Sequence, residues 1–183
     1  MPGQGETQPF FTIGHSNRSI EEFIALLSAS QIRLVADIRK IPRSRANPQF
    51  NEDALPEALA AEGISYERIE ALGGRRTKAR DISPAVNGFW ENRSFHNYAD
   101  YALSMEFAAG LEHLIAQGHR RRCAMMCSEA VWWRCHRRIV SDHLIARGET
   151  VLNIMSANRI DPAHLTPGAV PRRDHAVVYP GAR

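Results

Sequence analysis

The side chains most able to do chemistry are concentrated between Arg122 and Arg138, where all three cysteines of the chain lie. This segment opens with a short, mostly apolar run from Arg122 to Met126 and continues through Cys127 and Glu129 to Cys135-His136. The pattern predicts a buried strand that is followed at once by a helix from Val131 to Arg147. Because ligands of open α/β sheets bind where strands end and helices begin, we expect a functional site here.

Cys127 and Glu129 are the first candidates for catalysis in this segment. A thiol where a strand meets a helix N-terminus is activated, because backbone amides and the helix dipole favour the thiolate. Cys127 is therefore predicted as a nucleophile, and the alternative is an inert, half-buried thiol. Glu129, in the predicted first helical turn, is a candidate general acid or base if it is partly buried. The alternative is that it only interacts with the helix dipole.

A metal site is a different use of the same segment. It would gather Cys127, Cys135 and His136, since thiolates and imidazole nitrogens are ligands that zinc prefers. The spacing, two cysteines separated by seven residues with a histidine directly after the second, matches no recognised zinc motif. Our first hypothesis therefore assigns no metal ligand, and a divalent metal is the only cofactor that the sequence leaves open.

Polar residues also follow other predicted strands, which cover residues 10–14, 33–39 and 64–69. A fifth strand is predicted at 150–155. Right-handed crossovers place the carboxyl ends of parallel strands at one edge of the sheet, so we expect the polar groups to meet in one pocket. They are His15-Ser16-Asn17, Asp37-Ile38-Arg39, Gly73-Gly74-Arg75 and Cys127-Ser128-Glu129.

The types of these residues indicate how a phosphate-bearing substrate would be held and converted. Asp37 and Arg39 lie two apart on a strand and share a face, so they are expected to pair, with Asp37 orienting an arginine or His15. The predicted catalytic residues are Glu129, His15, Asp37 and Cys127. The predicted phosphate-binding residues are Ser16, Asn17, Arg39, Arg43, Ser44, Gly73, Gly74, Arg75 and Arg137.

Helical periodicity between the strands sets the fold class. Ser19 is a predicted N-cap of one helix, Asn51 is a predicted cap of another that runs to Glu62, and a third extends from Phe95 to Gln117. This alternation predicts an α/β fold, a single domain with a mostly parallel sheet of about five strands and helices on both faces. The predicted boundaries are a flexible tail at 1–9, the α/β domain at 10–156 and a packed C-terminal extension at 157–183.

The composition is that of an ordinary globular protein with a preference for arginine. The chain has 183 residues, a formal net charge of +3 and a pI near 9.0. Of its 23 basic residues only Lys40 and Lys78 are lysines, and the arginine fork binds phosphate with two hydrogen bonds. No apolar run is long enough to cross a bilayer, and residues 1–8 lack the regions of a secretory signal. We therefore expect a cytoplasmic protein with reduced cysteines and no membrane partner.

Taken together, the motifs resemble the bacterial family catalogued as domain of unknown function 488. The resemblance covers roughly Phe11 to Met155, and members usually show Cys-Ala-Glu where this chain has Cys127-Ser128-Glu129. It implies a small cytoplasmic α/β domain and supplies no catalytic role, because the family has no established activity. The segments that carry it are Thr12 to Ser16, Asp37 to Arg39 with Pro42 and Ser44, Leu72 to Arg75, Phe95 with Tyr98, and Met126 to Glu129 through Cys135 to Arg137.

These residues favour an enzyme, a hydrolase acting on a nucleotide or nucleic acid, as the first hypothesis. Arginines would hold the phosphates, and Phe50, Trp90 and Phe95 are candidates for stacking on bases. A non-catalytic module that binds nucleic acid or nucleotide is the alternative, with a thiol or metal protein as a third. The expected partner is an anionic small molecule or a nucleic acid, and the sequence leaves the oligomeric state open.

Overall fold

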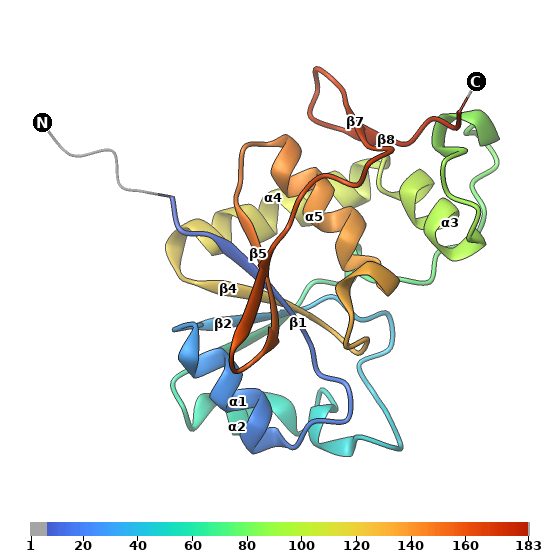
Figure 1. Ribbon diagram of the computed structural model, residues 1–183. Helices are drawn as coiled ribbons and strands as arrows, with labels where there is room; N and C mark the ends of the chain where they lie inside the picture. Colours follow the sequence, from blue (N-terminus) through green and yellow to red (C-terminus); the bar gives the residue numbers. More distant parts are fainter. Residues whose placement is uncertain (1–6, 183) are drawn as a thin grey trace, which may run out of the picture.

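A mixed sheet forms the centre of the computed structural model, which describes residues 7–182. Its strands are β1 (Phe10–Gly14), β2 (Leu34–Asp37), β3 (Ser65–Arg68), β4 (Cys123–Cys127), β5 (Val151–Ser156) and β6 (Arg159–Pro162). They lie in the order β3-β2-β4-β1-β5-β6, and only the β5–β6 pair is antiparallel. The predicted α/β class with a mostly parallel sheet is confirmed (Figure 1).

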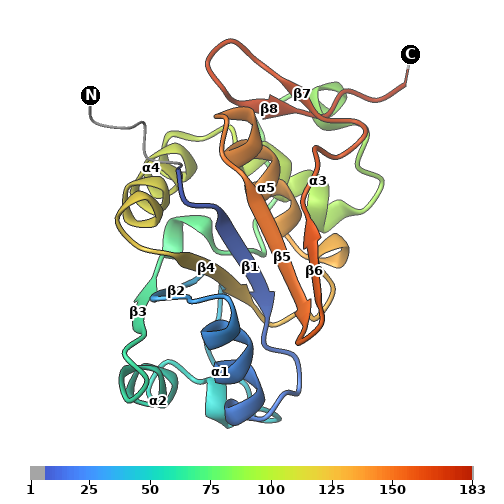
Figure 2. The same ribbon diagram turned by 60° about the vertical axis from the view of Figure 1, so that its left-hand side comes forward.

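Helices cover both faces of this sheet, as predicted. The α-helices are α1 (Ile20–Ala29), α2 (Leu55–Ala60), α3 (Arg93–Tyr101), α4 (Met105–Arg120) and α5 (Arg137–Ala146). Short 3-10 helices are η1 (Pro48–Phe50), η2 (Glu70–Leu72), η3 (Pro84–Asn87) and η4 (Trp132–Arg134). Helices α1 and α2 lie on one face, whereas α3, α4 and α5 lie on the other (Figures 1 and 2).

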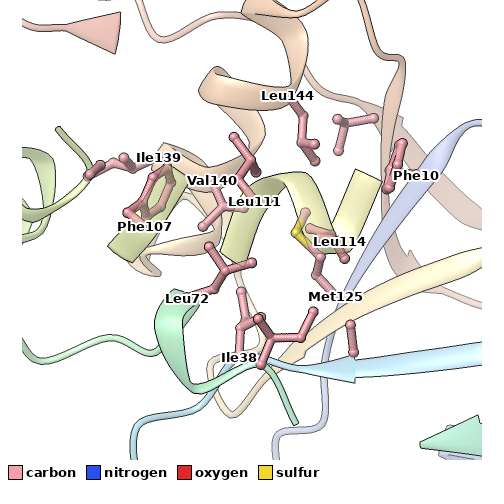
Figure 3. Close-up of a cluster of buried hydrophobic side chains, with 14 of the residues drawn as sticks. Phe10, Ile38, Leu72, Phe107, Leu111, Leu114, Met125, Ile139, Val140 and Leu144 are labelled. Atoms are coloured by element: carbon pink, nitrogen blue, oxygen red, sulfur yellow. The ribbon is translucent and has the colours of Figure 1, made fainter. Parts of the chain in front are cut away.

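The two faces bury separate hydrophobic clusters because successive strand residues point to opposite sides. Phe10 and Met125 pack with α4 and α5 in one cluster (Figure 3). Their neighbours Phe11 and Met126 pack with α1 and α2 in the other. Strands β1, β2 and β4 are buried at every residue, which is why they are recognisable in the sequence as continuous apolar runs.

Three predicted helices have different bounds. The helix predicted up to Glu62 with Asn51 at its start is wrong there, because α2 runs only from Leu55 to Ala60 and Asn51 does not cap it. Ser19 caps α1 as expected, and its hydroxyl accepts from the Glu22 N–H in a capping box. The predicted helix from Phe95 to Gln117 is wrong as a single helix, since α3 ends at Tyr101 and α4 begins at Met105. Ser104 separates them because its hydroxyl accepts the Phe107 N–H and so caps α4.

The predicted helix from Val131 to Arg147 is also wrong at its start. Strand β4 ends at Cys127, and α5 begins only at Arg137. The residues between them form a loop that contains η4. Strand and helix are therefore not adjacent, and this changes the environment of every predicted catalytic group in the segment.

The C-terminal extension packs on the domain and contributes a strand to its sheet. Strand β6, the antiparallel edge strand, was not predicted. Two short strands, β7 (Val170–Pro171) and β8 (Val177–Val178), pair separately, and the Tyr179 hydroxyl donates to Asp142 of α5 at 2.7 Å. Residues 7–9 form no helix or strand, and the first six residues of the predicted tail lie outside the described range. Within residues 7–182 no helix is long and apolar enough to span a membrane.

Candidate functional site

A pocket of about 900 Å³ lies at the carboxyl ends of the central strands. Loops that follow β1, β2, β3 and β4 all contribute to its wall, as parallel strand directions require. Ten of the predicted site residues line it: His15, Ser16, Asn17, Arg39, Arg43, Ser44, Gly74, Arg75, Cys127 and Glu129. The structure therefore brings these ten residues from four distant segments together in one pocket.

Three predicted site residues, Asp37, Gly73 and Arg137, do not line the pocket. Asp37 is fully buried and binds Arg39 side-on, with Nε–Oδ1 at 2.9 Å and Nη2–Oδ2 at 2.6 Å. Gly73 is buried in the turn after η2, where its N–H donates to the Glu70 carbonyl at 2.9 Å. Asp37 therefore orients an arginine, as predicted, and does so from behind the pocket wall.

The Asp37–Arg39 pair extends into a buried network that holds His15. Arg39 Nη2 also donates to the Phe50 carbonyl at 2.7 Å, and the Tyr66 hydroxyl donates to Asp37 Oδ2 at 2.6 Å. Arg39 Nη1 lies 3.3 Å from His15 Nε2. Most of the hydrogen-bonding capacity of Arg39 is therefore used inside the protein, although its edge reaches the pocket.

His15 is fixed in one tautomer by its neighbours. A guanidinium can only donate, so Nε2 accepts from Arg39, and Nδ1–H donates to the Ser16 carbonyl at 2.8 Å. The ring stacks on Phe50 with a centroid separation of 4.4 Å. Burial, with a smaller contribution from the charge of Arg39, lowers the pKa of His15. His15 is therefore neutral at physiological pH and supports the Ser16 turn.

Arg137 lies under the loop between β4 and α5. Its side chain is 1% exposed, and its guanidinium donates to the Glu129 carbonyl at 2.6 Å and approaches the Thr12 hydroxyl at 3.5 Å. It forms no ion pair with any residue between 7 and 182. The prediction that Arg137 reaches the pocket edge is wrong, because the loop covers it.

The thiol at the start of α5 is Cys135 and not Cys127, which corrects the prediction for Cys127. The Arg137 N–H points at Cys135 Sγ over 3.5 Å. Burial opposes ionisation of Cys135, but its hydrogen bond with Cys127 and the charge of Arg137 outweigh burial and lower its pKa to about 6. The same hydrogen bond, together with burial, raises the pKa of Cys127 to about 12. The hydrogen bond between the two thiols and the nearby charge of Arg137 thus favour ionisation of Cys135 over that of Cys127.

His136 lies against both thiols. Its Nδ1 is 3.6 Å from Cys135 Sγ and 3.9 Å from Cys127 Sγ, while Nε2 is 2.8 Å from the Ile38 carbonyl. Gly74 packs on the same ring, and a Cβ at this position would lie 2.9 Å from Nδ1. Cys127, Cys135 and His136 all line the pocket, and we call this largely buried group of three side chains its floor.

Glu129 differs from its prediction in two ways. It lies in the loop and not in a helical turn, and its side chain is exposed rather than partly buried. Its position is nevertheless well defined, since its carbonyl accepts from Arg137 and packs against Gly14. It is the only carboxylate among the residues that line the pocket.

Two cations of the pocket, Lys40 and Arg134, were missed by sequence reasoning. Lys40 directly follows Arg39 after the end of β2, so its position in the sequence could have identified it as a pocket residue. Arg134 belongs to η4, which lies inside the helix predicted from Val131 to Arg147. Neither forms an ion pair with residues 7–182, and the same holds for Arg75. The pocket therefore presents unpaired positive charge.

The N-terminus of α3 supplies a wall that no strand-end argument could reveal. Asn92 caps α3, and Ser94 and Phe95 line the pocket with it. Phe95 is half-buried and stacks on Trp90 with centroids 4.8 Å apart. Of the three aromatic residues predicted to stack on bases, only Phe95 is available, since Phe50 is 0% and Trp90 7% exposed.

The fold and the site together define an α/β protein with a basic pocket at the carboxyl ends of its strands. Two cysteine thiols and one histidine imidazole lie at the floor of this pocket. A family model described as "Domain of unknown function DUF488" matches residues 19–144. Because the match covers more than half of the chain, the protein belongs to the DUF488 family, and the resemblance inferred from the motifs is confirmed. No curated protein and no solved structure matches the chain.

Proposed function

We propose that the protein is an enzyme that acts on a phosphate-bearing substrate, a nucleotide or nucleic acid, bound in this pocket. The observation that carries the proposal is the charge of the lining, five cationic side chains against one carboxylate. The cations are Arg39, Lys40, Arg43, Arg75 and Arg134. A concave site lined by one sign of charge concentrates ligands of the opposite sign.

Three of these cations are free to bind a ligand. Asp37 neutralises Arg39 inside the protein, and Arg43 approaches Glu52 at 3.4 Å. Lys40, Arg75 and Arg134 have no such partner among residues 7–182. The exposed guanidinium groups can each bind a phosphate with two parallel hydrogen bonds.

Backbone strain at the pocket supports a functional role. Among residues 7–182, four non-glycine residues have positive φ angles, and two of them, Ser16 at 50° and Arg75 at 55°, line the pocket. Such conformations are sparsely populated for L-residues and persist where the surroundings enforce them, often at ligand sites. The His15 hydrogen bond to the Ser16 carbonyl is one such constraint.

A nucleotide fits the remaining lining. Phe95 offers a half-buried aromatic face at the pocket wall, and base stacking on such a face is sequence-tolerant. Asn92 and Ser94 add hydrogen-bonding groups beside Phe95 at the start of α3, and Asn17 adds another from the loop after β1. Phosphates near the cations and a base near Phe95 would use both parts of the pocket.

Glu129 is the candidate general base for hydrolysis because it is the one carboxylate of the lining. It would take a proton from water as the water oxygen bonds to phosphorus and the bond to the leaving oxygen breaks. Ser16 and Asn17 would donate hydrogen bonds to the phosphoryl oxygens. His15 is neutral and acts from behind the wall by holding the Ser16 turn.

Binding is tested by titrating ATP and a short single-stranded RNA into the protein by calorimetry. Arg75→Gln and Arg134→Gln are each expected to weaken binding about tenfold, because each removes a charge-assisted hydrogen bond. The control is Arg173→Gln, an exposed arginine outside the pocket, and it should have no effect. Kd should rise steeply with salt, since neutralised phosphates release counterions. Binding that is absent, or lowered equally by the control, refutes the proposal.

Catalysis is tested separately by phosphate release from the ligand that binds. Glu129→Gln should abolish release and leave Kd nearly unchanged. If the wild-type protein binds the ligand but releases no phosphate, the non-catalytic nucleotide-binding alternative is the correct one.

We also propose that the protein resides in a reducing compartment, the cytoplasm, because Cys123, Cys127 and Cys135 are all free thiols.

A further inference from the structure

Three side chains of metal-binding type, from two separate segments of the chain, meet at the floor of the pocket. Cys127 ends β4, Cys135 follows η4 and His136 directly precedes α5. Their ligand atoms lie within 4.8 Å of one another. The loop that contains η4 brings Cys135 back to Cys127, which sequence spacing alone does not reveal.

The two nitrogen–sulfur distances are close to those between ligands of a tetrahedral zinc ion. Bonds of about 2.3 Å to sulfur and about 2.0–2.1 Å to nitrogen separate the two atoms by about 3.6 Å. His136 Nδ1 lies 3.6 Å from Cys135 Sγ and 3.9 Å from Cys127 Sγ. We propose that Cys127, Cys135 and His136 bind one Zn²⁺ ion at the floor of the pocket.

The surroundings orient the histidine as a ligand. His136 Nε2–H donates to the Ile38 carbonyl, so in the neutral ring the lone pair is on Nδ1 and faces both sulfurs. Metal-bound histidines usually donate their second N–H to such an acceptor, which fixes tautomer and ring orientation. The ring also packs against Tyr98 in an edge-type contact, at a centroid separation of 4.9 Å.

Gly74 and Arg137 complete the support of the site. Gly74 leaves room beside Nδ1, because a Cβ there would lie 2.9 Å from this atom. The backbone N–H of Arg137 points at Cys135 Sγ, and a donor in this position stabilises a metal-bound thiolate. Thiolate together with imidazole selects zinc over magnesium or calcium, which prefer oxygen ligands.

With three protein ligands, one zinc position is open. Catalytic zinc sites keep three protein ligands and one water or substrate, whereas structural sites use four. All three ligands line the pocket, so the open position faces it. This last step rests on the proposed function, since a phosphate oxygen or a reacting water would occupy the position.

Cobalt titration of the metal-free protein tests the site directly, because Co²⁺ in tetrahedral thiolate sites gives charge-transfer and intense visible bands. We expect one Co²⁺ per chain, displaced by Zn²⁺. Cys127→Ser and Cys135→Ser should each weaken binding at least about 100-fold, beyond the usual effect of losing a supporting residue. The matched control is Cys123→Ala, which removes the third cysteine from the opposite end of β4, and it should bind as tightly as wild type.

Three results would overturn the proposal. The first is a wild-type protein without the tetrahedral thiolate spectrum, and the second is binding of fewer than one Co²⁺ per chain. The third is an equal loss of Co²⁺ affinity in Cys123→Ala and in the two serine variants. Circular dichroism of each variant shows whether it folds, and the wild-type spectrum decides the question if a variant does not. A wild type without these bands means that the three groups only hydrogen-bond with one another.

A final titration separates this site from the proposed function. Pyrophosphate is added to the Co²⁺-loaded protein and, in parallel, to the metal-free protein. A shift of the visible bands shows an open position that an anion reaches. Unchanged bands refute the open position, while anion binding to the metal-free protein still tests the basic pocket by itself.

Discussion

The buried pair of Asp37 and Arg39 provides the sharpest test of how the site is held, through Asp37→Asn. Asp37 Oδ1 accepts from the Arg39 main-chain N–H and from Nε. Oδ2 accepts from Arg39 Nη2 and the Tyr66 hydroxyl. An amide in either orientation places its NH₂ group against at least one guanidinium N–H, so the substitution replaces an attractive contact by a repulsive one.

The expected effect is large because both partners are buried. Asp37 is 0% and Arg39 4% exposed. Removing one partner of a buried ion pair leaves an uncompensated charge and lowers the free energy of unfolding by about 3–5 kcal/mol. That is a substantial fraction of the roughly 5–15 kcal/mol that stabilises a typical domain.

The chain contains a matched control for this prediction. Arg159 and Asp161 are also two residues apart on a strand, and the carboxylate again accepts from Nε at 3.0 Å and Nη2 at 2.8 Å. Their side chains are 60% and 29% exposed. Urea unfolding of Asp37→Asn and Asp161→Asn should show a large loss for the first and little change for the second. Equal losses would refute the view that burial makes the Asp37 pair structurally essential.

Two further predictions concern positions outside the ligand-binding groups. Gly14→Ala should lower the free energy of unfolding by about 2 kcal/mol or more, because its Cβ would overlap the Glu129 carbonyl; an unchanged Tm contradicts this. Burial lowers the pKa of His143 from 6.5 to about 3, so the unfolded state binds more protons between these pH values. Stability should therefore decrease as the pH falls below 6.5, with His143 contributing up to about 1.4 kcal/mol per pH unit. In urea titrations at several pH values, His143→Leu should reduce the dependence of the free energy of unfolding on pH. A smaller dependence should remain from His15, whose pKa is also lowered. An unreduced dependence would show that His143 titrates normally.

The pocket could be predicted from the sequence because its strands are easy to recognise. Phe10–Gly14 and Cys123–Cys127 are buried on both faces and appear as apolar runs. The direction of parallel strands then places the residues after them at one edge. His15, Arg39 and Glu129 were grouped correctly on this argument, without any contact being known.

The segment after β4 could not be predicted in detail. Its apolar residues, such as Val131 and Trp132, fit a helical pattern, yet they form a loop with a 3-10 turn. The loop shifts the helix start to Arg137, which moves thiolate stabilisation from Cys127 to Cys135. A tertiary contact, the Arg137 bond to the Glu129 carbonyl, holds the loop in place, and periodicity carries no information about it.

The sequence near two other elements, the start of α4 and the strand β6, does contain features that could have predicted them. Ser104, which caps α4, is followed by Glu106 in the first turn, a recognisable helix start. The two-residue turn Ala157-Asn158 connects β5 to β6, and asparagine is typical of such hairpins. The position of Asn92 at the pocket had no such signal, because α3 approaches from a segment without strands.

A crystal structure of the protein with ATP would show whether the basic pocket binds phosphate groups. We expect phosphate oxygens within hydrogen-bonding distance of at least two of the side chains of Lys40, Arg75 and Arg134, with the base against Phe95. ATP bound elsewhere on the molecule, or absent at a concentration that saturates binding in solution, would contradict the claim that this basic pocket recognises phosphate-bearing ligands.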